Sequence, residues 1–169
     1  AYKILMQQCN KYHKDSETKQ MILEAFAKLF DNGHALLLSD LSTDQKQFLE
    51  KEIQYHIPWR VVFSNSPTTP ARPVLDASSR TSFRKYKTGG RSLNDLVAKG
   101  KIEFINLVKV LLRFTVGSYA LTGDLKQFYN AFKLNQDQWN LQRFLWIDDL
   151  DPDGDILEAV IVTLIYGVK

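Results

Sequence analysis

LQRFLWIDDLDPDGDILEAVIVTLI, residues 141–165, is the stretch that decides the fold of this chain. Two apolar runs rich in β-branched and aromatic residues, 141–147 and 157–165, flank a loop with five aspartates between residues 148 and 155. Apolar runs of this length around a turn-forming loop predict two strands joined as a hairpin. We therefore expect an antiparallel sheet in this part of the chain.

A second hairpin and several short helices are predicted before this stretch. Residues 59–64 and 72–76 are β-like runs separated by turn formers. Residues 16–31 carry apolar side chains at the spacing of one helical face, and Asn32-Gly33 follows as a stop signal. The other expected elements are helices at 42–54, 92–95 and 102–113, a strand at 118–123 and a helical turn at 125–133. This mixture of helices and antiparallel hairpins indicates an α+β fold.

Composition narrows the class of protein. The chain has 169 residues, enough for one ordinary domain, and its single cysteine, Cys9, excludes an intrachain disulfide and a multi-cysteine zinc site. No run approaches the ~20 apolar residues that a membrane helix needs. The sequence stops just past an apolar run, which a domain rarely does. We therefore expect a fragment of a longer intracellular protein without a membrane partner.

Charge is distributed unevenly along the chain. Nine lysines and arginines against two acids lie between Arg80 and Arg113, whereas six acids and no basic residue lie between Phe144 and Val168. A basic surface beside an acidic pocket suits a protein that grips polyanions and holds cations. Two solvated surfaces of opposite sign explain the same pattern, and charge alone does not exclude them.

The acidic loop allows three interpretations. Trp146-Ile-Asp-Asp-Leu150 is similar to the Tyr-x-Asp-Asp box of a polymerase, and Asp149-x-Asp151-x-Asp153-Gly154 to the start of a calcium loop. The calcium loop fails at its twelfth position, Val160, where a bidentate Glu should complete the coordination shell. Five close carboxylates without a nearby cation would repel one another unless water screens them. We therefore favour a solvent-exposed hairpin turn.

Three other features are candidates for binding phosphate or metal. Asp124 follows the expected strand 118–123, where it can hold a metal ion at a sheet edge or cap the next turn. Arg72 begins the return strand of the first hairpin and can reach a triphosphate or pair with Asp76. The basic segment 80–91 can follow the phosphates of nucleic acid or form an ordinary solvated loop.

Taken in order, these motifs resemble the reverse transcriptase of long-terminal-repeat retrotransposons of the BEL/Pao group. The resemblance covers about residues 20–169, in matching order and spacing. Its motifs are Phe30-Asp-Asn-Gly-His34, Tyr55-His56, Arg72-Pro-Val-Leu-Asp-Ala-Ser78, Ser92-Leu-Asn-Asp95, Leu111-Leu-Arg-Phe114, Ala120 to Tyr129, Phe144-Leu-Trp146 and Val162 to Gly167. Each motif alone is weak, whereas the ordered set is fairly specific.

The resemblance implies a domain organisation. Residues 1–117 would form the reverse-transcriptase-like fingers, and residues 118–169 would begin the palm. In this family the Tyr166-Gly167 segment precedes the catalytic Asp pair, so Asp148-Asp149, which lies before that segment, does not match it. The Asp pair, the thumb and any RNase H domain would lie beyond Lys169.

The resemblance also implies roles for single residues. Asp124 would be the first catalytic aspartate and would bind Mg²⁺ together with the backbone carbonyl of Leu125. The implied nucleotide-binding residues are Arg72 at the triphosphate, Tyr129 as the gate against a ribose 2′-OH, and Tyr166 and Gly167 beside the incoming nucleotide. The implied template-binding residues are Arg80, Arg84, Lys85, Lys87, Arg91 and Asn94.

These roles define a fragment of an RNA-directed DNA polymerase. Its expected partners are an RNA or DNA template–primer, a deoxynucleoside triphosphate and the remainder of the polymerase polypeptide. The expected location is the cytoplasm, a virus-like particle or the nucleus, and the fragment alone should not extend a primer. Phe63 departs from the family, which often has a Lys there. This departure leaves room for an alternative, a domesticated, non-catalytic domain that binds nucleic acid or protein. A further alternative is a structural domain that dimerises through an exposed apolar strand at the end of the sequence.

Overall fold

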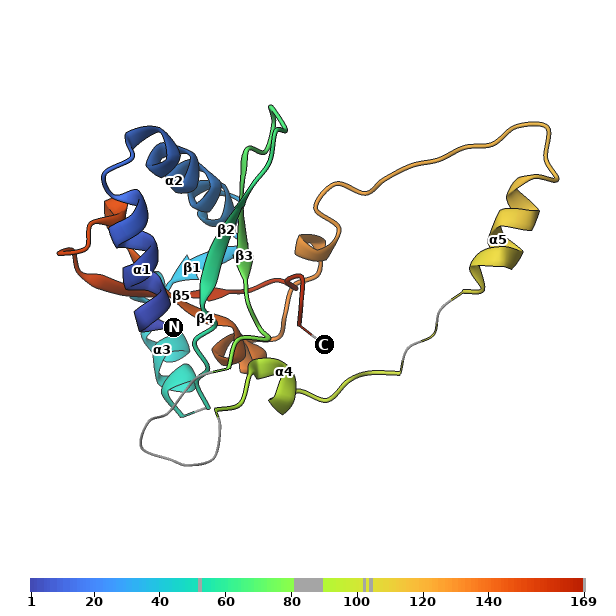
Figure 1. Ribbon diagram of the computed structural model, residues 1–169. Helices are drawn as coiled ribbons and strands as arrows, with labels where there is room; N and C mark the ends of the chain where they lie inside the picture. The colour runs from blue at the N-terminus through green and yellow to red at the C-terminus, as the bar shows by residue number, and fades with distance from the viewer. Residues whose placement is uncertain (52, 81–89, 102, 104, 169) are drawn as a thin grey trace.

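The computed structural model describes residues 1–51, 53–80, 90–101, 103 and 105–168, and it has an α+β fold with antiparallel strands in two small sheets (Figure 1). The fold class expected from the sequence is confirmed at this level. The helices are α1 Tyr2–Tyr12, α2 Ser16–Asp31, α3 Thr43–Glu50, α4 Leu93–Leu96 and α5 Leu107–Phe114. The strands are β1 Ala35–Leu37, β2 Trp59–Phe63, β3 Ala71–Leu75, β4 Arg143–Ile147 and β5 Ile156–Ile161. Short 3₁₀ turns cover Leu38–Asp40, Tyr129–Ala131, Gln136–Gln142 and Asp148–Leu150.

Both predicted hairpins form. β4 and β5 pair antiparallel with Phe144 opposite Ala159, and β2 pairs with β3 with Val62 opposite Arg72. The short strand β1, which the sequence did not reveal, pairs with β5 so that the larger sheet has the order β1-β5-β4. Residues near position 35 are thereby placed beside residues near position 161.

An aromatic core joins the two sheets to the helices. The ring of Phe26 on α2 lies 4.4 Å from that of Trp146 and 4.8 Å from that of Trp59, measured between centroids. Trp59 also donates a hydrogen bond from Nε1 to the carbonyl oxygen of Leu145 at 2.8 Å. This bond satisfies the indole nitrogen of a buried side chain and ties β2 to β4. The core thus contains residues from both predicted regions, 1–117 and 118–169.

Helix α2 has the bounds that the sequence predicts, and its ends explain why. Asp15 precedes it, and the Asp15 side chain accepts a hydrogen bond from the backbone N–H of Thr18 at 3.1 Å. At the other end Gly33 has a φ of 65°, the left-handed conformation that glycine adopts at low cost. The N–H groups of Gly33 and His34 donate to the carbonyls of Phe30 and Leu29, both at 2.9 Å. This is the Schellman arrangement, and it directs the chain into β1.

The segment between α4 and β4 differs most from expectation. The predicted strand at 118–123 is not formed, and α5 begins at Leu107, while positions 102 and 104 of the predicted helix 102–113 lie outside the described residues. In Figure 1, α5 stands apart from the sheets on two long connections, and its apolar side chains are exposed. Tyr119 and Leu121 are also more than 90% exposed. An isolated strand is not stable without a neighbour to complete its hydrogen bonds, which explains the difference.

The acidic loop is a turn, as predicted, but it is more ordered than a purely solvated one. Lys19 on α2 donates from Nζ to Asp149 Oδ2 at 2.8 Å, so the expectation of no nearby cation was wrong. Trp146 donates from Nε1 to Asp148 Oδ1 at 3.0 Å, and Leu150 is fully buried. Within the described ranges, no helix is long and apolar enough to cross a membrane.

Candidate functional site

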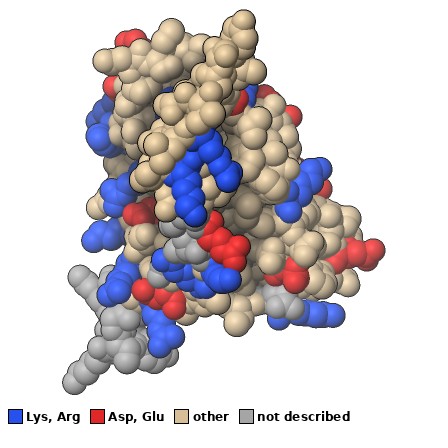
Figure 2. Space-filling view, turned by 90° about the vertical axis from the view of Figure 1, so that its right-hand side faces the viewer, with Lys and Arg blue, Asp and Glu red and all other residues tan. Residues whose placement is uncertain are grey.

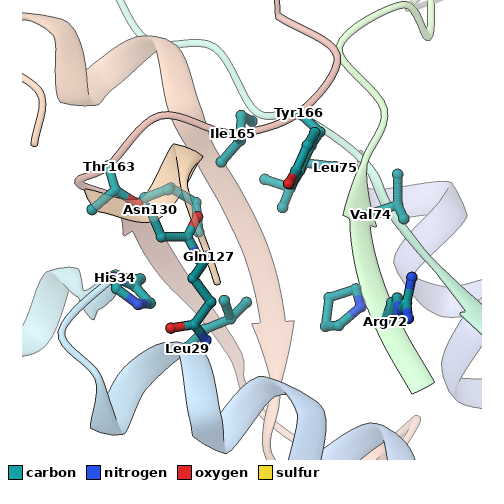
Figure 3. Close-up of a pocket in the computed structure, with 12 residues that line it drawn as sticks. Leu29, His34, Arg72, Val74, Leu75, Gln127, Asn130, Thr163, Ile165 and Tyr166 are labelled. Atoms are coloured by element: carbon teal, nitrogen blue, oxygen red, sulfur yellow. The ribbon is translucent and has the colours of Figure 1, made fainter. Parts of the chain in front are cut away.

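A pocket of about 590 Å³ lies between the end of α2, strand β3 and the segment that follows β5 (Figure 3). The fold creates it by bringing three distant segments together. The N–H of Val162 donates to the carbonyl of His34 at 3.0 Å, and the N–H of Leu134 donates to the carbonyl of Val162 at 2.9 Å. The end of β5 is thus held between the residues after α2 and the segment that leads into β4.

Arg72 lines one side of this pocket from strand β3. Its Nη2 donates to Thr69 Oγ1 at 3.0 Å, which leaves most of the guanidinium donors available for another acceptor. The alternative interpretation, in which Arg72 pairs with Asp76, is not supported. Asp76 instead has Arg60 as its ion-pair partner, with Nε and Oδ2 4.0 Å apart.

Two tyrosines with predicted nucleotide roles meet at the edge of the pocket. Tyr166 lines it, and the ring of Tyr129 packs against the ring of Tyr166 with centroids 4.1 Å apart. Gly167 follows with a φ of 89°, and its carbonyl accepts a hydrogen bond from Asn94 Nδ2 at 2.7 Å. Of the four predicted nucleotide-binding residues, Arg72 and Tyr166 therefore share a pocket, and the other two lie directly beside Tyr166.

The opposite end of the pocket is polar, and sequence reasoning missed it. His34, Gln127, Asn130 and Thr163 line this end, as Figure 3 shows. Thr163 is 1% exposed, and its Oγ1 has no hydrogen-bond partner among the described residues. The only signal in the sequence was a threonine within the apolar run VIVTLI.

Asp124 and Leu125 lie outside this pocket, on the exposed connection between α5 and the turn at Tyr129–Ala131. A carboxylate and a carbonyl are suitable ligands for Mg²⁺, which typically takes one or two carboxylates plus waters and substrate phosphates. Among the described residues, however, no group of three or more His, Cys, Asp or Glu side chains could hold a metal. Asp124 and Leu125 alone could therefore complete only part of a coordination shell.

The predicted template-binding residues fall into two sets. Arg84, Lys85 and Lys87 lie outside the described residues. Arg80 pairs through Nε with Asp95 Oδ2 at 3.4 Å, and Asn94 donates to Ser78 Oγ at 3.1 Å as well as to Gly167. On the face that Figure 2 presents, basic and acidic side chains are interspersed. The two hydrogen bonds of Asn94 hold α4 against Ser78 and Gly167. The backbone carbonyl of Arg91 accepts a hydrogen bond from the Tyr55 hydroxyl.

A network of charged side chains centred on the buried Arg143 lies at a second pocket, which Arg143 and Glu158 help to line. Arg143 is 4% exposed, and it donates from Nε to Asn140 Oδ1 at 2.7 Å and from Nη1 to Glu158 Oε2 at 2.9 Å. His56 Nε2 lies 3.2 Å from the same carboxylate oxygen. Burial raises the pKa of Glu158, but hydrogen bonds from His56 and Arg143 outweigh it, and the pKa lies below its ordinary value. The network stabilises the junction between β4, β5 and the residues before β2.

Comparison with models of known protein families gave no match, and a search of curated proteins gave no similar sequence. The resemblance to reverse transcriptases therefore continues to depend on the ordered motifs alone.

Proposed function

We propose that this chain is a fragment of an RNA-directed DNA polymerase of the BEL/Pao type, with reverse-transcriptase-like fingers and the beginning of the palm. The observation that carries the proposal is the shared pocket of Arg72 and Tyr166, which are 94 residues apart in the sequence. Both were expected to contact the incoming nucleotide. Tyr129, expected to sense the sugar, packs on the ring of Tyr166.

In this proposal each residue has a distinct task. Arg72 neutralises the phosphates of a deoxynucleoside triphosphate, because a guanidinium can form two parallel hydrogen bonds with phosphate oxygens. Tyr129 and Tyr166 form an aromatic wall for the sugar and base. In the full polymerase, Asp124 and the backbone carbonyl of Leu125 would hold part of the coordination shell of Mg²⁺, which would supply electrostatic stabilisation for nucleotidyl transfer. The protein contributes by positioning the reactants.

Nucleotide binding by the isolated chain tests this function directly. We expect deoxynucleoside triphosphates to bind weakly, and Arg72→Ala to reduce the affinity ~10-fold through loss of a charge-assisted hydrogen bond. Lys14→Ala is a control for the loss of one positive charge, because Lys14 is exposed at the turn between α1 and α2 and does not line this pocket. Isothermal titration calorimetry measures both variants. The absence of binding, or an equal loss for both variants, would contradict the proposal.

The surroundings of Phe63 favour one alternative, a domesticated domain that binds nucleic acid without catalysis. Phe63 occupies a position where the family often has a Lys, and its ring packs edge-on against Tyr12 with centroids 5.9 Å apart. A side chain used for packing cannot supply a cationic contact to a triphosphate. Under this alternative the full-length parent protein, given template–primer, Mg²⁺ and nucleotides, would bind the nucleic acid but add no nucleotide to the primer.

A further inference from the structure

We propose that Thr69 is a phosphorylation site, and that its phosphate pairs with Arg72 and thereby closes the triphosphate end of the pocket. The modifying enzyme is a protein kinase that recognises Ser or Thr followed by proline. The phosphorylation itself is independent of the proposed nucleotide-binding function, whereas its effect on nucleotides rests on that function. The features that carry this inference lie at the tip of the β2–β3 hairpin and in the first residues of β3.

The sequence of the hairpin tip marks Thr69 as the acceptor. Only two of the five prolines in the chain follow a hydroxyl residue, in Ser66-Pro67 and Thr69-Pro70. Arg72 stands three residues after Thr69, whereas the third residue after Ser66 is uncharged. Kinases use charge patterns around the acceptor to select their substrates, because complementary charges favour one partner over another. A proline-directed kinase with an acidic substrate groove would therefore prefer Thr69 to Ser66.

The tip of the hairpin is accessible to an enzyme. In Figure 1 it projects beyond the rest of β2 and β3, and none of residues 64–70 is buried. Ser64 closes the hairpin below the tip: its N–H donates to the carbonyl of Pro70 and its Oγ to the carbonyl of Thr69, both at 2.8 Å. These bonds use backbone carbonyls and leave the Thr69 side chain exposed. A kinase can thus reach Thr69 without disturbing the core.

Arg72 already contacts the atom that would carry the phosphate. Its Nη2 donates to Thr69 Oγ1 at 3.0 Å, and within the described ranges no carboxylate forms an ion pair with it. In the kinase reaction Thr69 Oγ1 attacks the γ-phosphorus of ATP, the bond to ADP breaks, and the hydroxyl proton passes to the catalytic base of the kinase. The product phosphate has a charge of about −1.5 to −2 at pH 7 and three acceptor oxygens. A guanidinium this close can form two charge-assisted hydrogen bonds with it.

Pairing with the phosphate would take Arg72 away from a nucleotide. Arg72 is the one lysine or arginine among the described residues that line the pocket (Figure 3). A phosphate on Thr69 occupies this guanidinium and also repels a triphosphate by its like charge. The unmodified hydroxyl, in contrast, offers Arg72 only one neutral acceptor. Phosphorylation would therefore switch the pocket from a state that accepts triphosphates to one that excludes them.

Phosphorylation of the intact chain tests the site. The probe is a proline-directed kinase that prefers a basic residue three positions after the acceptor, supplied with ATP, and mass spectrometry locates the phosphate. We expect phosphate on Thr69 and its loss in Thr69→Val, which keeps the shape of the side chain without the hydroxyl. Ser66 is the internal control, because it precedes a proline but lacks the basic residue. An equal rate on Ser66, or no phosphate on Thr69, would overturn the inference.

Phosphorus NMR of the modified chain tests the contact with Arg72. A neighbouring guanidinium favours the dianion, so the second pKa of the Thr69 phosphate should be lower in the folded chain than in urea, where the contact is lost. The same sample serves for both titrations, so the comparison does not depend on a variant. Equal pKa values in the two conditions would overturn the pairing.

Nucleotide titration separates this inference from the proposed function. We expect complete phosphorylation to weaken binding of deoxynucleoside triphosphates ~10-fold, as much as Arg72→Ala, because both remove the same charge-assisted hydrogen bond. Thr69→Val should leave the affinity unchanged. Unaltered affinity of the phosphorylated chain would overturn the switch and retain the nucleotide site. If the unmodified chain binds no nucleotide, the proposed function and the switch fail, whereas the phosphorylation site and its pairing with Arg72 are decided by the two preceding experiments.

Discussion

Cys9 shows how strongly the core changes the chemistry of one side chain. It lies on the inner face of α1 and is 0% exposed, and burial raises the pKa of its thiol to about 11. Only the thiolate reacts with disulfide reagents, so at pH 8 the reactive fraction falls from ~10% for a thiol with the ordinary pKa of 9.0 to ~0.1% for Cys9. We expect Ellman's reagent to label the folded chain at least ~100-fold more slowly than the chain in urea. Equal rates would show that Cys9 is accessible and ionised in the native state.

Glu158 leads to a prediction about pH. Its folded-state pKa lies below the ordinary value of 4.5, so its contribution to stability is complete above about pH 4.5 and is lost as the pH falls through the folded pKa. Because Glu158 is partly exposed, we expect Glu158→Gln to cost only about 1–2 kcal/mol at pH 7. Thermal denaturation of both proteins at pH 7 and pH 3.5 measures the effect. A difference that stays constant between these pH values would contradict the assignment.

At the scale of elements, the end of α2 depends on the conformation of one glycine. Gly33 has a φ of 65°, and a Cβ built there would meet nothing within 4 Å, so an alanine would suffer only the backbone cost. We expect Gly33→Ala to lower the free energy of unfolding by about 1 kcal/mol. Gly100→Ala is the control, because Gly100 has equal space and lacks a positive φ. Urea denaturation measures both, and equal effects would exclude the proposed cap.

The elements that the sequence predicted are those with local signals. The hairpin strands are recognisable from their apolar runs, and α2 from its face and its Asn32-Gly33 stop. Helix α1 was not predicted, although its buried residues, Leu5, Cys9 and Tyr12, have the spacing of one helical face, so the signal for it was present in the sequence. Strand β1 has only three residues and is defined by its pairing with β5, a contact between distant segments. Local patterns cannot reveal such a strand.

The same distinction applies to the candidate site. Arg72 and Tyr166 were predicted because each belongs to a motif that is continuous in the sequence. The polar end of the pocket is formed by residues from three separate segments of the chain. No pattern in the flanking sequence marks any of these residues as part of a binding site. Thr163 in particular appears as an ordinary strand threonine, and only the folded chain shows that its hydroxyl lacks a partner among the described residues. Such sites depend on tertiary contacts, which a single sequence does not display.

At the scale of the whole molecule, the two sheets share one aromatic core while α5 remains outside it. Phe26 contacts Trp59 in the smaller sheet and Trp146 in the larger one, so neither sheet can lose its packing alone. The apolar residues of α5, in contrast, gain nothing from this core. We infer that the sheets and α2 unfold together, and that α5 contributes little to the stability of the described structure.

The uneven charge of the whole chain leads to the last prediction. The basic residues of segment 80–91 should contact the phosphates of a template, and each phosphate contact on a single strand adds about −0.7 to the slope of log affinity against log salt. We expect Arg91→Ala to make the slope shallower by about that amount, since the Arg91 side chain is exposed. Lys14→Ala removes an equal charge at the turn between α1 and α2 and should leave the slope unchanged. Fluorescence anisotropy with a labelled single-stranded RNA, repeated over a salt series, measures all three proteins. A wild-type slope near zero would exclude the template-binding role, because phosphate contacts cannot form without releasing counterions.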